Sequence, residues 1–217
     1  MDHPINRYWH LRLQALKAVL DKNRFEAHLA VDTQEAVQLA IEQIIPPLSP
    51  QSISWGGSMT FVQSGLYQRL KEQKHIACID TFDKNITAAE TLERRRQALL
   101  TDLFITGTNA VTEKGHLVNL DMIGNRVAAL TFGPKAVIVM IGRNKLVPDL
   151  ESAMDRVKHY AAPTNVMRLN KKTPCVKTGQ CQDCSSPDRI CNSWTITEKS
   201  FPKGRIKVIL INQDLGL

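Results

Sequence analysis

Residues 101–147 decide the fold of this 217-residue chain, and they read TDLFITGTNAVTEKGHLVNLDMIGNRVAALTFGPKAVIVMIGRNKLV. Short apolar runs rich in β-branched residues alternate here with glycines and uncharged polar residues. The runs predict strands over 103–112, 116–121 and 136–141, the first two joined by a hairpin-like turn over 113–116. A segment that only filled a core would not need so many turn-forming and hydrogen-bonding groups. We therefore expect the floor of a small-molecule site at these strand ends.

Outside this stretch, predicted strands alternate with amphipathic helices, and most loops are short. Asp32 and Glu35 form a capping-box pattern that predicts the start of a helix. Pro46 and Pro47 are expected to stop this helix. This alternation predicts an α/β fold with a mostly parallel sheet and helices on both faces. Further strands are expected over 25–31, 52–55, 75–80 (a buried strand with Cys78) and 205–211, and further helices over 7–22, through Val62, Leu66 and Leu70, from Thr87 to about 100, and from Pro148.

The bulk composition is that of a globular protein, with 43% hydrophobic and 23% charged residues. A length of 217 residues suits one domain or one domain with a small appendage. The longest apolar run, over 136–141, is far shorter than the roughly 18 residues that a membrane span needs. The first residues carry scattered charges and no apolar block, so no secretory signal is expected. We expect a cytoplasmic protein without a membrane span.

The net charge of +7 gives little support for nucleic-acid binding. Arg94, Arg95 and Arg96 fall on a predicted helix, where consecutive side chains point about 100° apart and cannot form one tight patch. Only 6% of the residues are aromatic, so few rings are available to stack on bases. A basic surface or attraction of a small anionic substrate explains the charge better.

Gly56, Gly57 and Ser58 lie between a predicted strand and a predicted helix. Glycines there let a ligand approach the backbone, and the free amides at a helix start favour an anion. Ser58 is suited to cap the helix. A tight turn with an ordinary N-cap explains the same residues, so both interpretations stay open. Neither the dinucleotide-binding motif G-x-G-x-x-G nor a P-loop occurs.

The polar residues of the central stretch form the main candidate site. Asn119 and Asp121 fall on the same face of a strand because side chains alternate. Arg126 offers a fixed cation that can grip a carboxylate or phosphate in two places, and Asp121 offers a base or hydroxyl acceptor. The alternative is that these side chains satisfy turn backbone and a surface ion pair. The expected anion or substrate site comprises Gly56, Gly57, Ser58, Thr108, Asn109, Asn119, Asn125 and Arg126, with Asp121 and Glu113 as candidate catalytic groups.

The histidines give weaker signals. They are scattered, and no pair has metal-ligand spacing, so surface or structural roles are expected for most of them. His116 is kept as a candidate because it lies near the polar stretch. No G-x-S-x-G elbow and no Ser/His/Asp triad is recognisable in the sequence.

The most specific chemical signal is the spacing C-x5-C-x2-C-x6-C, formed by Cys175, Cys181, Cys184 and Cys191. Thiols stay reduced in the cytoplasm, so a metal is expected before disulfides. Four thiolates suit an iron–sulfur cluster or zinc, although the spacing matches neither a zinc ribbon nor a bacterial ferredoxin. Redox pairing and free thiols remain alternatives. We expect the cysteines to lie in a loop or appendage over 170–203, within one domain over 1–217.

Four segments carry a resemblance to a known family: TGTNAVTEKGHLVNLDMIGNRVAAL, IGRNKLVPDLESAM, PCVKTGQCQDCSSPDRICN and RIKVILINQDLGL. The chain resembles the lactate-utilization (LUD) domain family over about 7–217. The resemblance implies a three-layer α/β/α sandwich similar to the sugar-phosphate isomerase and CoA-transferase-like superfamily (NagB/RpiA/CoA-transferase-like). It also implies an iron–sulfur-linked system oxidising L-lactate to pyruvate, in which such subunits work together. The ferredoxin-like motifs of the larger lactate-utilization subunit are absent here.

Three functions follow as expectations. The first is a subunit or relative of a system that oxidises lactate or a similar hydroxy acid, an oxidoreductase component with a metal centre at the cysteines. The second is a stand-alone isomerase or transferase acting on a phosphorylated sugar or acyl thioester, for which Asp121 and Glu113 are the available bases. The third is a non-catalytic metal or redox sensor. The expected partners are a small anionic metabolite, other lactate-utilization subunits or a second copy of the chain, and no nucleic acid.

Overall fold

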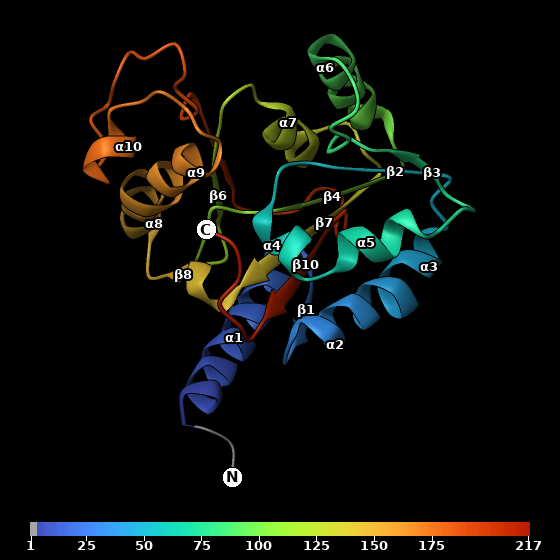
Figure 1. The fold of residues 1–217 in the computed structure, drawn as a ribbon. Coiled ribbons are helices and arrows are strands. Elements are labelled where there is room, and N and C mark those ends of the chain that lie inside the picture. Colours follow the sequence, from blue (N-terminus) through green and yellow to red (C-terminus); the bar gives the residue numbers. More distant parts are fainter. Residues whose placement is uncertain (1–3) are drawn as a thin grey trace.

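A large parallel β-sheet forms the centre of the molecule, described here for residues 4–217 from a computed structural model (Figure 1). All neighbouring strands in this sheet pair in parallel. The last strand lies between the first strand and a central one, so that Val208 stands beside Ala27 and Val139. The strand order is β1 (Glu26–Ala30), β10 (Ile206–Ile211), β7 (Ala136–Gly142), β4 (Leu103–Gly107), β2 (Ser52–Trp55) and β3 (Ala77–Ile79).

Helices cover both faces of this sheet, as the alternation of elements predicts. Side chains of a strand point alternately to its two faces. Val137 and Val139 pack with α1 (Pro4–Lys22) and α7 (Asn125–Thr131). Ile138 packs on the other side, against the second group of helices. That group comprises α2 (Thr33–Gln38), the π-helical turn η1 (Leu39–Ile44), α3 (Ile45–Leu48), α4 (Met59–Gln63) and α5 (Leu66–Lys71).

A smaller second sheet lies beside the first and was not expected from the sequence. Its order is β8 (Leu146–Val147), β5 (Ala110–Thr112), β6 (Leu117–Asp121) and β9 (Ser193–Thr197). Strands β5 and β6 form the predicted hairpin. One face of this sheet packs with α8 (Leu150–Arg156) and the π-helical turn η4 (Val157–Ala161). The remaining segments are α6 (Ala88–Gln97), α9 (Ala162–Arg168), α10 (Cys175–Thr178) and the 3₁₀ turns η2 (Ala98–Leu100) and η3 (Arg143–Lys145).

The N-cap expected at Asp32 is present, but Glu35 accepts from the backbone N–H of Val31 instead of closing the capping box on Asp32, and the proline prediction is wrong. The side chains of Asp32 and Thr87 each accept a hydrogen bond from the backbone N–H three residues on. The helix that Asp32 begins does not stop at Pro46. It passes through the π-helical turn η1, and both prolines lie inside α3, which ends at Leu48 and is followed by Ser49 in a left-handed conformation. Proline is tolerated at the start of a helical segment because its missing N–H has no helical partner there.

Two further predictions are corrected by the arrangement of the strands. Residues 103–112 do not form one strand, because the chain leaves the large sheet after β4 and enters the small sheet at β5. Cys78 is exposed rather than buried, since β3 is the edge strand of the large sheet. The cysteine segment over 170–203 is also less irregular than expected, because it contains α10 and β9. Within residues 4–217, no helix is long and apolar enough to cross a membrane.

Candidate functional site

A cavity of about 230 Å³ opens where the two sheets meet. On the large sheet, its wall comes from the residues just after β2, β3 and β4, which are neighbours with parallel direction. Open α/β sheets bind ligands at this carboxyl edge. The opposite wall comes from β6, the segment after it, and α9. The residues that line the cavity include Gly57, Ser58, Thr81, Phe82, Arg95, Gly107, Thr108, Asn109, Asp121, Asn125, Arg126, Lys145, Asn165, Arg168 and Ile190.

The floor of the cavity depends on a glycine at the point where the chain changes sheets. Gly107 ends β4, and a Cβ atom there would lie 2.5 Å from the Ser58 Oγ and 3.2 Å from the Met140 carbonyl oxygen. A larger residue would push β4 away from the loop after β2. Thr108, which follows, donates its hydroxyl proton to the carbonyl oxygens of Ala110 and Val118. This pair of contacts fixes the turn into the second sheet.

Arg126 is the buried centre of the predicted polar cluster. Its Nε donates to the Asp121 Oδ1 at 3.0 Å, and its Nη1 donates to the carbonyl oxygen of Gly107 and to the Asn119 side chain. Its Nη2 donates to the Asn109 side chain at 2.9 Å and lies 2.7 Å from the Asp121 carboxylate. The guanidinium therefore ties the end of β4, the hairpin strand β6 and helix α7 together.

This network changes the roles expected for Arg126 and Asp121. Every nitrogen of the guanidinium already donates to a protein oxygen, so Arg126 has no free edge with which to grip a substrate carboxylate. The Asp121 carboxylate also accepts from the backbone N–H groups of Arg126 and Val127. Both carboxylate oxygens are therefore already engaged with protein donors. We assign the pair to positioning the cavity wall.

Asn119 is brought into the same network but not onto the cavity surface. It is fully buried, and its Oδ1 accepts from Arg126 and from the backbone N–H of Asn109. Asn109 in turn accepts the backbone N–H of Leu120 through its own Oδ1. The Nδ2 of Asn119 has no hydrogen-bond partner among the described residues. The two asparagines thus lock β6 to the turn after β4.

Of the three residues in the Gly56–Gly57–Ser58 turn, two line the cavity and one packs against the core. Gly57 and Ser58 line the cavity, whereas a Cβ at Gly56 would lie 2.9 Å from the Phe104 ring. Ser58 caps α4, as predicted, by accepting the backbone N–H of Phe61 at 3.2 Å. Helix α4 has only five residues, so its dipole adds little attraction for an anion.

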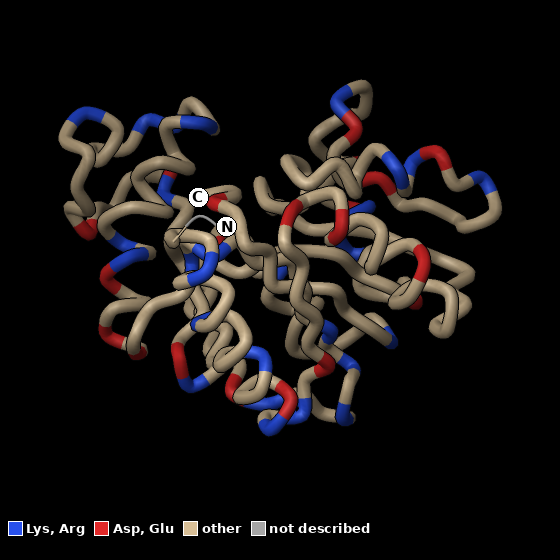
Figure 2. The backbone as a smooth tube through the Cα atoms, turned by 90° about the horizontal axis from the view of Figure 1, so that it is seen from below, with Lys and Arg blue, Asp and Glu red and all other residues tan. Residues whose placement is uncertain are grey.

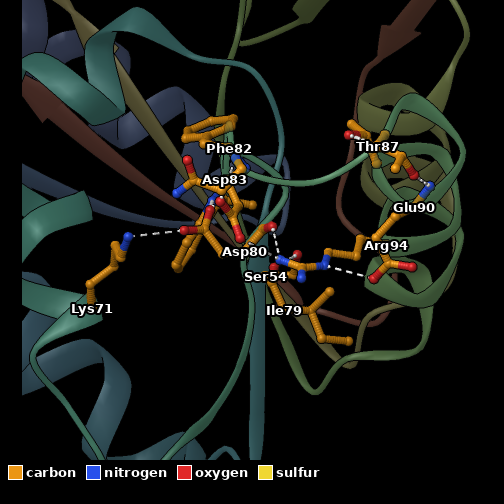
Figure 3. A network of polar contacts seen from close by, with 12 residues as sticks. Ser54, Lys71, Ile79, Asp80, Phe82, Asp83, Thr87, Glu90 and Arg94 are labelled. Atoms are coloured by element: carbon orange, nitrogen blue, oxygen red, sulfur yellow. Dashed lines mark hydrogen bonds and ion pairs between the residues drawn. The ribbon is translucent and has the colours of Figure 1, made fainter.

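A polar network at the end of β3 holds the loop that closes one side of the cavity (Figure 3). The Asp80 carboxylate accepts from the indole N–H of Trp55 and from the backbone N–H of Phe82. It also pairs with Lys71 at 3.1 Å and accepts from the hydroxyl of Tyr67. The Phe82 ring lies 6.2 Å from the Trp55 ring, between centroids. Phe82 is therefore fixed as a wall of the cavity.

The same network distinguishes the arginines of α6. Arg94 donates to the backbone oxygen of Asp80 and pairs with Asp83 and Glu90, which anchors α6 (Figure 3). Arg96 pairs with Glu93 on the surface. Arg95 lines the cavity and, within residues 4–217, makes no hydrogen bond or ion pair. The three side chains diverge, as expected for consecutive helical residues, and one of them is aimed at the site.

The positive charge of the cavity comes mainly from residues that sequence analysis missed. Arg95, Arg126, Lys145 and Arg168 line it, while Asp121 is the one acidic side chain among the described lining residues and is already paired with Arg126. Arg168 donates to the Asn165 side chain from Nε and Nη2. Elsewhere, Lys and Arg are scattered along many segments together with Asp and Glu (Figure 2). Arg95 and Arg168 are therefore the cations of the lining that keep hydrogen-bonding capacity for a ligand.

Lys145 is the most unusual of these cations. It lies in the GRNKLV segment after β7, is only 4% exposed, and donates from Nζ to the Thr108 carbonyl oxygen at 3.0 Å. Burial, aided by the nearby charges of Arg156 and Arg126, lowers the pKa of Lys145 from 10.5 to about 7. Its position inside residues 101–147 is the one sequence signal that could have identified it.

Two predicted site residues lie away from the cavity. Glu113 is in the hairpin turn between β5 and β6, where it is exposed and paired with Arg12 of α1. His116 is in the same turn, and its Nδ1 is buried without a partner in the described structure. Neither residue lines the cavity, because the hairpin turn is at the far end of β6 from Asp121. We do not retain Glu113 as a catalytic candidate.

The four cysteines of the spaced motif surround a second, much smaller cavity of about 20 Å³. All four are free thiols, and the backbone N–H of Asp183 is 3.4 Å from the Cys181 Sγ. Lys158 and Arg189 line the same cavity, and Ile190 lines both this cavity and the large one. Across residues 4–217, no three Cys, His, Asp or Glu side chains are grouped so that they could hold one metal ion.

Comparison with known proteins places the chain in a family. The LUD domain matches residues 13–211, which is nearly the whole chain. The chain belongs to the LUD-domain family. This match confirms the resemblance noted in the sequence. The protein is therefore related to lactate-utilization proteins through its domain. No curated protein matches this LUD domain.

Solved structures extend the comparison to the fold. A DUF162-family protein from Deinococcus radiodurans is similar to this LUD domain with a TM-score of 0.52 and 12% sequence identity. The likeness covers 94% of this chain and 98% of that chain. At this identity the similarity concerns the fold alone.

Proposed function

We propose that the cavity between the two sheets binds a small carboxylate of the 2-hydroxy or 2-oxo acid class, as a component of lactate-type oxidation. The observation that carries this proposal is the charge of the lining: Arg95 and Arg168 keep guanidinium groups available to a ligand, whereas the acidic side chain of the lining, Asp121, is already paired with Arg126. An anionic ligand is attracted to such a site, and the attraction is strong where water is largely excluded. Membership of the LUD-domain family supports the choice of hydroxy acids.

The size of the cavity favours a small metabolite. Pockets that enclose drug-sized ligands have volumes of roughly 300–1,000 Å³. A cavity of about 230 Å³ suits a three- to four-carbon acid, whereas most of an acyl thioester of coenzyme A would extend outside. A phosphorylated sugar is the remaining ligand for an isomerase or transferase. It would be the expected ligand if the chain shares the chemistry of the sugar-phosphate isomerase superfamily, whose fold the family resemblance implies.

Within this proposal the residues divide into two groups. Arg95 and Arg168 meet the carboxylate, since Arg95 makes no hydrogen bond within the described chain and Arg168 keeps an Nη1 group that donates to no protein atom there. Thr108, Asn125 and Ser58 offer polar atoms to the hydroxyl or carbonyl group. Asp121 and Arg126 position the wall behind them.

A ligand panel tests the proposal by isothermal titration calorimetry. L-lactate, pyruvate, a sugar phosphate, inorganic phosphate and the neutral amide of lactate are titrated into the purified protein. We expect lactate or pyruvate to bind and the amide to bind at least tenfold more weakly, because it lacks the carboxylate. Preference for the sugar phosphate would favour an isomerase or transferase. Equal binding of lactate and its amide, or no binding of any anion, would refute an anion site.

We also propose that the cysteine segment holds a thiolate metal centre, iron–sulfur or zinc. The donor chemistry supports this, because four cysteine residues line one cavity and the backbone N–H of Asp183 donates to the Cys181 sulfur. Arg189 and Lys158 would offset the negative charge of the thiolates. The thiols do not have ligand geometry in the described structure, so binding would have to draw the segment inward. Such a centre would supply electron transfer if it is a cluster, or local order if it is zinc.

Metal analysis after anaerobic purification and reconstitution tests this second proposal, with Cys191→Ser as the variant. Cys78→Ser is the matched control, because Cys78 lies on β3 outside the motif. We expect stoichiometric metal in the wild type and in the control, and loss of most of it in Cys191→Ser. Iron with sulfide and a visible absorption band identifies a cluster, and zinc alone identifies a structural site. Absence of metal from the wild type, or equal metal content in Cys191→Ser and Cys78→Ser, would contradict the metal centre. Thiol chemistry or a redox sensor would then explain the cysteine motif better.

A further inference from the structure

Lys145 occupies a place in which a lysine is rarely found. Lys145 belongs to the cavity lining but is almost fully buried, and its Nζ donates to the Thr108 carbonyl oxygen at 3.0 Å. Gly216 covers it from the other side, where a Cβ would lie 3.2 Å from the Nζ. The amine is thus held in one position at the boundary between core and cavity.

No acidic side chain of residues 4–217 forms an ion pair with Lys145. The carboxylate on the nearest cavity wall, Asp121, is paired with Arg126. The charged side chains that act on Lys145 from neighbouring elements are Arg126 and Arg156, and Arg156 of α8 donates to the backbone oxygens of Asn144, Asn109 and Leu217, the last of which also lines the cavity. A lysine that is desolvated beside other cations is favoured in its neutral form, which is the nucleophilic one. The pKa of about 7 is consistent with this setting.

We infer that Lys145 is an amine nucleophile that condenses with the carbonyl group of a small ligand bound in the cavity. The neutral amine adds to the carbonyl carbon, so that a C–N bond forms and the carbonyl oxygen takes up a proton. Loss of the oxygen as water, with both amine hydrogens, leaves an imine between Lys145 and the ligand. The step needs no oxidant or reductant, because the atoms lost are those of one water molecule.

The choice of ligand class rests on the proposed function. A 2-oxo acid, the oxidation product of a 2-hydroxy acid, carries a carboxylate next to a carbonyl carbon. Arg95 and Arg168 are the cations available to that carboxylate, and Lys145 faces the same cavity. The inference that Lys145 is nucleophilic does not depend on this ligand class, because the burial and the hydrogen-bond partner of the amine are properties of the protein alone.

Reductive trapping tests the inference on the full-length protein. Pyruvate is the oxo-acid probe, propanal is the neutral carbonyl probe, and sodium cyanoborohydride reduces any imine to a stable secondary amine. The modified residue is identified by peptide mass spectrometry, and pyruvate binding is measured separately by calorimetry. Lys145→Arg keeps the cation but cannot form an imine, and Lys74→Arg at an exposed lysine is the matched control.

We expect one N-carboxyethyl group on Lys145 in the wild type and in Lys74→Arg, and none at the site in Lys145→Arg. The labelling rate should rise as pH passes through about 7. At neutral pH the rate should exceed that of an ordinary lysine by up to about a thousandfold, the ratio of neutral fractions. Because the wild-type map identifies the residue directly, the result stands even if the variant fails to fold.

The remaining outcomes separate the two proposals. Pyruvate that binds but labels surface lysines indiscriminately, or labels nothing, would overturn the nucleophile and leave the carboxylate site intact. Selective labelling of Lys145 by propanal without any binding of pyruvate would support the nucleophile and refute the oxo-acid ligand. Failure of both would overturn both.

Discussion

The buried pair of Arg126 and Asp121 shows how a site can look catalytic in sequence and be architectural in structure. Both residues occur where a substrate-binding cation and a base are expected. Their hydrogen-bonding capacity is instead directed at the protein, where it joins β4, β6 and α7. Sequence alone reveals the polar character of the residues but not how many of their bonds are already made.

Replacing Arg126 by Gln should therefore affect stability more than ligand contacts. It leaves Asp121 as a buried charge without its partner, and breaking a buried pair in this way costs about 3–5 kcal/mol. Urea unfolding of Arg126→Gln should show this loss. Arg96→Gln is the control, because it removes a surface pair with Glu93 worth about 0–1 kcal/mol. Similar losses in the two variants would contradict the assignment of Arg126 to the framework.

Lys145 makes a prediction about stability and pH. Its pKa is about 7 in the folded state and 10.5 for an ordinary lysine, so between these values the unfolded chain binds more protons. The free energy of unfolding should therefore rise by up to about 1.4 kcal/mol per pH unit across this window. Conversely, the protein should lose this stability as the pH falls toward 7, because folding then requires the buried lysine to stay charged or to release its proton. Lys145→Met should remove this slope, as measured by urea unfolding between pH 7 and 9. A parallel pH dependence in the wild type and the variant would contradict the low pKa.

At the scale of elements, the helix starts were predictable and the changes of direction were not. Asp32 and Thr87 cap helices because the capping bonds are local in sequence. The passage from β4 into the second sheet depends instead on partners that are distant in sequence, since β8 and β9 pair with the hairpin. The continuation of the helix through Pro46 depends on a π-helical turn that has no reliable sequence signature.

Gly107 makes this change of sheets testable. Gly107→Ala places a Cβ within 2.5 Å of the Ser58 Oγ and 3.2 Å of a backbone oxygen. Overpacking of this kind costs about 1–3 kcal/mol. Gly57→Ala is the control. Gly57 lines the same cavity, but a Cβ atom there would meet nothing within 4 Å. Thermal and urea unfolding should separate the two variants, and equal stability would show that the floor is not tightly packed.

At the scale of the whole molecule, the parallel sheet with helices on both faces was predictable from the alternation of elements. The location of the site at strand ends was predictable for the same reason, because parallel strands bring their carboxyl ends together. The cations of the site were not, since Arg95, Lys145 and Arg168 come from segments far apart in the sequence. Arg95 in particular differs from Arg94 and Arg96 only in the direction that α6 gives it.

The most direct test of the account is the affinity of Arg95→Gln for the acid that the calorimetric panel selects. Loss of a charged hydrogen bond to the carboxylate is worth about 1.5–3 kcal/mol, so we expect binding to weaken by at least tenfold. Arg96→Gln, one residue away on the same helix and facing solvent, should bind as the wild type does. Both variants remove one positive charge, so a general loss of electrostatic attraction would weaken them equally. Equal affinities of Arg95→Gln and Arg96→Gln would contradict the proposal that this cavity holds the carboxylate.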